Sequence, residues 1–127
     1  MTVAEYLAHQ LDASGKSRND IAREAGFERP NVLSMMRTGA MKIPLTAAPG
    51  LARALGIDPA AFLRRCMAEY VPELLAAMVS QGTGPISRNE AQILSVIRAA
   101  TKNADPALRT KEQERELAQA VRRIFTS

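Results

Sequence analysis

Aromatic residues are scarce in this chain. Its 127 residues include three Phe, two Tyr and no Trp, together 4% of the total, although 46% of all residues are hydrophobic. A hydrophobic core must therefore be built mainly from Leu, Ile, Val, Ala and Met. Because several of these are strong helix formers, the composition favours packed helices over a sheet. We therefore expect an all-α protein.

Several other features are missing as well. The only Cys and the only His, Cys66 and His9, provide neither an internal disulfide nor a Cys/His zinc site, so we expect no metal and no cofactor. No run of about 18 apolar residues is present to cross a membrane, and the first residues lack the apolar core of a signal peptide. These absences predict a soluble, cytoplasmic chain with no membrane partner.

The residue groupings of an enzyme active site are also not found. The sequence shows no Ser/His/Asp set, no Cys/His pair with a plausible third member, no phosphate-binding loop and no carboxylate pair marked by its surroundings. We therefore expect no enzymatic activity.

Positive charge is in modest excess. The formal net charge is +4 and the isoelectric point is near 9.7, which suits an anionic partner such as nucleic acid. Between residues 16 and 42 there are six basic and three acidic side chains, a local net of +3. Much of the excess is therefore expected on this one segment, although the rest of the chain is mildly basic too.

The spacing of apolar residues predicts a series of short helices. Ser17 followed by Asp20, and Asp58 followed by Pro59, are typical of helix starts. Pro72 must kink or restart the fifth helix. The expected helices cover approximately residues 2–13, 17–25, 29–38, 46–55 and 59–78.

A hinge and two further helices are expected after these five. Residues 80–86 combine two Gly, a Pro and small polar residues, which predicts a linker. Ser87 with Glu90, and Thr110 with Gln113, predict the starts of two more helices. Two helices bury little surface by themselves, so residues 87–127 must fold back on residues 1–79 or bind another chain.

The stretch from Ser17 to Arg37, SRNDIAREAGFERPNVLSMMR, has the residues that two steeply crossing helices need. Ala22 is small enough for the point of contact, and Gly26 accepts a positive φ at the turn. The residues expected to pack inward are Ile21, Ala22, Ala25, Phe27, Val32 and Met35. This pattern is typical of the helix-turn-helix, which places its second helix in the major groove of DNA.

The segment from about Val3 to Leu63 resembles the phage-repressor and Cro-like (Xre-like) helix-turn-helix family of transcriptional regulators. The matching residues are IAREAGF, NVLSMMRTG, Pro44 and LARALGIDPAAFL. The resemblance implies a λ-repressor-like five-helix DNA-binding domain over residues 1–79, followed by a short two-helix C-terminal region over residues 87–127. A phage or plasmid origin would suit this family.

The resemblance also implies which residues contact double-stranded DNA. The start of the second helix of the motif is expected to meet base edges, through Arg29, Pro30, Asn31, Leu33 and Ser34. The guanidinium of Arg29 can form a bidentate contact with guanine. The expected phosphate contacts are Arg18, Asn19, Arg37 and Lys42.

Two functions are left open by these patterns. The leading one is a sequence-specific transcriptional repressor that binds an inverted-repeat operator as a homodimer. The alternative is an antitoxin-like protein whose C-terminal helices, residues 87–127, bind and neutralise a partner protein. An isolated C-terminal fragment that is unfolded and monomeric would favour the alternative, and a stable helical dimer would favour the repressor.

Overall fold

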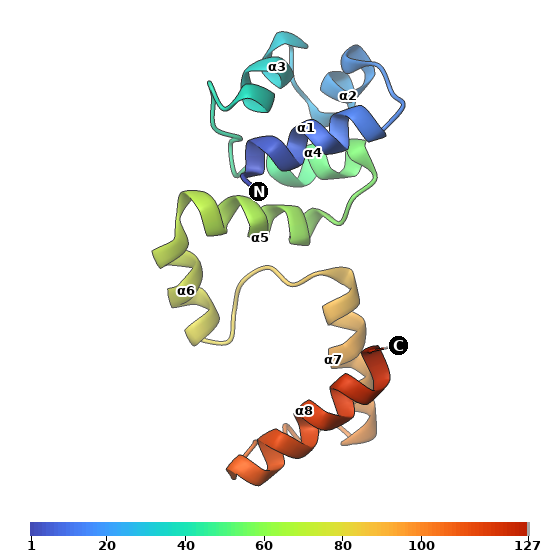
Figure 1. Ribbon diagram of the computed structural model, residues 1–127, viewed down its shortest axis with the longest axis vertical. Helices are drawn as coiled ribbons and strands as arrows, with labels where there is room; N and C mark the ends of the chain where they lie inside the picture. The colour runs from blue at the N-terminus through green and yellow to red at the C-terminus, as the bar shows by residue number, and fades with distance from the viewer. Residues whose placement is uncertain (127) are drawn as a thin grey trace. The chain divides into compact units, whose positions relative to one another are not determined.

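The computed structural model describes residues 1–126, which form eight α-helices and no strand (Figure 1). The expected all-α class is therefore confirmed. The helices are α1 (Val3–Ala13), α2 (Arg18–Ala25), α3 (Asn31–Thr38), α4 (Ala48–Leu55), α5 (Pro59–Tyr70), α6 (Pro72–Ser80), α7 (Arg88–Ala100) and α8 (Lys111–Phe125).

Two compact units make up the chain. The first is Met1–Ala91 and the second is Gln92–Ser127, so the division falls inside α7. Residues 81–87 are non-helical, whereas Ser80, the first residue of the predicted linker 80–86, is the last residue of α6. The first turn of α7 belongs to the first unit because the Arg88 amide donates a hydrogen bond of 2.6 Å to Asp58, and Glu90 lies 3.9 Å from Arg64.

The helix starts predicted from capping residues are confirmed. The side chains of Ser17, Asp58, Ser87 and Thr110 accept hydrogen bonds from amides in the first turns of α2, α5, α7 and α8. Asp58 also accepts the bond from Arg88, and these backbone donors hold the pKa of its carboxyl below the ordinary value. The helix is interrupted at Val71, between the end of α5 and the start of α6, so the predicted interruption at Pro72 is confirmed too.

The hydrophobic core lies in the first unit. There α1 packs on α3, α4 packs on both α2 and α5, and α6 packs on α5. The Phe62 ring stacks on Tyr6 at a centroid distance of 5.9 Å, and the Arg65 guanidinium lies over the Tyr6 ring, 4.0 Å from its centre. The largest fully buried side chains are Val3, Leu7, Leu11, Ile21, Leu33, Met36, Ile43, Leu51, Phe62 and Cys66.

Gly26 has a conformational role in this unit. It ends α2 with a φ of +86°, as the turn of the sequence motif predicts. Gly50, on α4, lies beside the end of α2, where a Cβ would be 3.4 Å from the carbonyl oxygen of Ala25, an ordinary van der Waals contact. Ala22, expected at the point where two helices touch, is buried.

The orientation of α3 differs from the expectation. Leu33 and Met36 are buried in the core, whereas Met35 is 42% exposed and Val32 is only half-buried. The prediction that Val32 and Met35 provide the inward face is therefore wrong for Met35. Val32 with Met35 and Leu33 with Met36 both have the spacing of one helix face. The packing of α3 against α1 buries the second pair.

Cys66 is part of the core of the first unit. Its side chain is fully buried, and this burial, followed by the nearby Glu69 carboxylate, raises the pKa of the thiol to about 11. The thiol therefore stays protonated near neutral pH and has the character of a small apolar core group.

We expect Leu33→Ala to lower the free energy of unfolding by about 2–5 kcal/mol, because it leaves a cavity in the core. Met35→Ala, on the outward side of the same helix, should change it by no more than about 0.5 kcal/mol. Urea denaturation of both variants measures this difference. Equal costs for the two substitutions would contradict the observed orientation of α3.

Candidate nucleic-acid interface

One face of α3 is turned away from the core. Asn31, Ser34, Met35 and Thr38 are all exposed, and their spacing of three, four and seven residues places them on a single helical stripe. We call these four residues the outer face of α3. Arg29 and Pro30, both exposed, immediately precede it.

Most of the residues predicted to contact bases are at this surface. Arg29, Pro30, Asn31 and Ser34 are exposed on or beside the outer face of α3. Leu33 is a correction, because its side chain is fully buried in the core and cannot reach a ligand. Met35 and Thr38 were missed, although counting three, four and seven residues from Asn31 would have found them.

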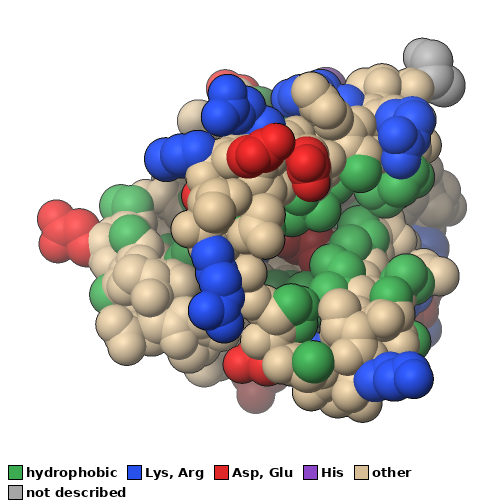
Figure 2. Space-filling view, turned by 90° about the horizontal axis from the view of Figure 1, so that it is seen from below, with side chains coloured by type: hydrophobic (Ala, Val, Ile, Leu, Met, Phe, Trp, Pro, Cys, Tyr) green, Lys and Arg blue, Asp and Glu red, His purple; other side chains and the backbone are tan. Residues whose placement is uncertain are grey.

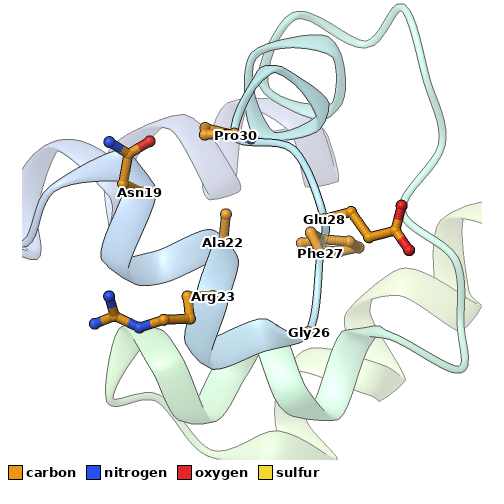
Figure 3. A pocket seen from close by; sticks show the side chains of 7 residues that line it. All are labelled: Asn19, Ala22, Arg23, Gly26, Phe27, Glu28 and Pro30. Atoms are coloured by element: carbon orange, nitrogen blue, oxygen red, sulfur yellow. The ribbon is translucent and has the colours of Figure 1, made fainter.

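A cleft separates the start of α3 from α2 (Figure 3). Its volume is about 500 Å³, and Ala22 points from α2 into the space between the two segments. Asn19 lies at the edge of the cleft on α2, and Pro30 lies across from it at the start of α3. The complete lining is Asn19, Ala22, Arg23, Gly26, Phe27, Glu28 and Pro30. The cleft thus brings together two of the residues predicted to contact DNA, from two different elements.

Arg18 and Arg37, predicted to contact phosphate, meet at one carboxylate. Both guanidinium groups donate hydrogen bonds to Asp12 at the end of α1, with N–O distances of 3.1 Å. Arg18 also donates to the carbonyl of Leu11 at 3.0 Å. This Asp12 cluster joins α1, α2 and α3 and carries a net charge of +1.

Arg29 and Lys42 differ from the other basic side chains between residues 16 and 42. Four of the six, namely Lys16, Arg18, Arg23 and Arg37, form ion pairs with acidic side chains. Lys16 also donates to the carbonyl of Ala54 at the end of α4. Arg29 and Lys42 have no ion-pair partner among residues 1–126, so no carboxylate in that part of the chain offsets their positive charge.

Lys42 lies in the loop between α3 and α4, and Tyr70 fixes this loop. The Lys42 ammonium is 5.5 Å from the centre of the Tyr70 ring, and the amide of Ile43 donates a hydrogen bond of 3.0 Å to the Tyr70 hydroxyl. Burial raises the pKa of the Tyr70 phenol, while the bond from the Ile43 amide opposes that rise. The end of α5 therefore sets the position of Lys42.

Two other features are absent from the part of the chain that the structure describes. Within residues 1–126, no three His, Cys, Asp or Glu side chains are grouped so that they could hold a metal ion. None of the described helices is long and apolar enough to span a lipid bilayer.

This chain was compared with protein families, curated proteins and solved structures. No protein family, no curated protein and no solved structure matches this chain.

We expect Tyr70→Phe to lower the free energy of unfolding by about 1–3 kcal/mol, because the buried amide of Ile43 loses its hydrogen-bond acceptor. Tyr6→Phe is the matched control, since the Tyr6 hydroxyl has no hydrogen-bond partner within residues 1–126 and the stacked ring is kept. Thermal or urea denaturation compares the two. If both variants are as stable as the parent chain, Tyr70 does not fix the loop.

Proposed function

We propose that this chain is a sequence-specific DNA-binding transcriptional regulator, and that helices α1 to α5 form a λ-repressor-like DNA-binding domain. In this proposal α3 enters the major groove, and the chain represses transcription by occupying a promoter as a homodimer. No catalytic step is involved.

The outer face of α3 is the observation that supports this proposal best. A short helix is held in the core by Leu33 and Met36 and presents Asn31, Ser34 and Thr38 outward, with the unpaired Arg29 at its start. Amide and hydroxyl groups can bond to base edges, and an arginine fork matches the acceptors of guanine. A rigid helix with polar groups on its outer side is the usual geometry for reading the major groove.

The residues around α3 suit contacts with the DNA backbone. The Asp12 cluster lies beside α3 because Arg37 belongs to that helix, and Lys42 follows α3 in the next loop. Asn19 and Pro30 face one another across the cleft between α2 and α3. Groups on both sides of an inserted helix can fix its register by binding phosphates, without reading sequence.

Selection from a randomised pool of duplex DNA tests the proposal directly. One α3 can read only a few base pairs, so a homodimer should enrich an inverted repeat with half-sites about 10 base pairs apart, or a multiple of that spacing. The selected DNA should bind more weakly as the salt concentration rises from about 50 to 200 mM. If no sequence is enriched, the proposal is wrong.

Arg29→Ala should reduce the preference for one base pair of each half-site by about 1–3 kcal/mol, because a bidentate contact is removed. Arg53→Ala on α4, also an exposed arginine, is the matched control and should leave the preference unchanged. Competition binding with single-base operator variants measures both. An Arg29→Ala variant with unaltered preference at every position would remove Arg29 from the set of base contacts.

Asp12→Asn should strengthen binding to all DNA sequences about three- to tenfold at low salt, because it frees Arg18 and Arg37 from their shared carboxylate. The slope of log affinity against log salt should become steeper by about one. Asp105→Asn, in the loop between α7 and α8, makes the same change in net charge and is the control. An effect confined to one operator sequence would argue against a phosphate role for this cluster.

A further inference from the structure

The helix α8 has an apolar side that is largely exposed. Leu117, Val121, Ile124 and Phe125 follow the spacing of one helical face, and they are 43% to 67% exposed. We call these four residues the α8 stripe. Hydrophobic side chains of this kind lie open at the surface in the space-filling view (Figure 2).

The second compact unit is too small to be stable on its own core. It begins at Gln92, and neither α7 nor α8 has a single buried residue within the described chain. Units below about 40 residues usually need a disulfide, a metal or oligomerisation. The only Cys, Cys66, lies in the first unit, and residues 1–126 show no group that could hold a metal ion. Of these three means of stabilisation, oligomerisation is the one that these observations leave.

Charge beside the α8 stripe indicates a second copy of the chain as the partner. Glu116 and Arg123 are seven residues apart, about two turns, so they lie on the same flank of the stripe. Neither is in an ion pair within residues 1–126. When two identical helices pair antiparallel, the same flank of each faces the other, so each Glu116 would meet an Arg123.

We propose that α8 pairs antiparallel with α8 of a second copy across a two-fold axis. Leu117, Val121 and Ile124 of both helices form the contact, and Glu116 of each copy lies opposite Arg123 of the other. The inference rests on the proposed function for the expectation of a symmetric dimer, and it adds the surface and the direction of pairing. A closed two-fold pair buries the stripe of both copies at once.

Charge reversal tests the pairing in the full-length chain without DNA. Glu116→Arg and Arg123→Glu should each weaken the dimer about tenfold or more, because two symmetric attractions become repulsions. The double variant E116R/R123E should regain most of the affinity. Arg115→Glu, a charge reversal on the side of α8 away from the stripe, should have little effect. Sedimentation equilibrium measures all four, and circular dichroism checks that helix content is kept.

Disulfide trapping tests the direction. Leu117→Cys and Ile124→Cys chains should cross-link when mixed and not when oxidised separately, because antiparallel pairing places position 117 near position 124. A parallel pair would instead cross-link each variant with itself. Gln119→Cys, on the far side of α8, is the control. The native Cys66 does not interfere because its thiol is buried and has a raised pKa.

Several results would overturn the inference. These are a monomeric parent chain, a dimer that is insensitive to both charge reversals, a double variant that is not restored, and self-cross-linking of each cysteine variant. If the parent chain is a monomer, the α8 stripe would instead be the binding surface for a different protein.

The proposed function is tested separately by the DNA selection. A monomer that still enriches a specific sequence would overturn only the pairing of α8. A dimer that behaves as expected but enriches no sequence would overturn only the proposed function.

Discussion

The burial of Leu33 and Met36 decides how the first unit can act. These two side chains hold α3 against α1, and they determine that Asn31, Ser34, Met35 and Thr38 are the residues that face outward. A rotation of α3 by one residue would bury Met35 and expose Leu33, which would change the chemistry of the entire outer face. The other features of the site, including the cleft and the Asp12 cluster, are arranged around a helix whose orientation the core has fixed.

Ion pairs within the first unit offset much of the positive charge of the segment between residues 16 and 42. Its net charge is +3, yet most of its basic side chains bind carboxylates within the first unit. The whole of residues 1–91 has ten basic and nine acidic side chains, whereas residues 92–127 have seven and four. The acidic side chains elsewhere in residues 1–91 therefore offset most of the positive charge of the segment 16–42, and the first unit as a whole has a net charge of only +1. In the proposed function, sequence-specific contact with DNA therefore depends on individual unpaired groups such as Arg29 more than on the net charge of the first unit.

The helix starts could be predicted because they depend on hydrogen bonds between residues that are close in the sequence. Capping side chains at Ser17, Asp58, Ser87 and Thr110 bond to amides three residues away, so the sequence contains both partners and the helix starts were found. The orientation of α3 could not be found in this way. Val32 with Met35 and Leu33 with Met36 are equally good apolar pairs, and only packing against α1 distinguishes them. The bond between Asp12 and Arg37 joins residues 25 apart, so no local pattern reveals it.

The two units differ in what they leave unsatisfied. In the first unit the core is closed, and no buried side-chain nitrogen or oxygen within residues 1–126 lacks a hydrogen-bond partner. Among the exposed groups of that unit, the polar residues of the outer face of α3 and the cations Arg29 and Lys42 suit a hydrated, anionic ligand. The open surface of α8 is apolar and suits another helix. A regulator of the proposed kind needs one surface of each sort, because a single α3 reads too few base pairs to select a site and pairing doubles that number.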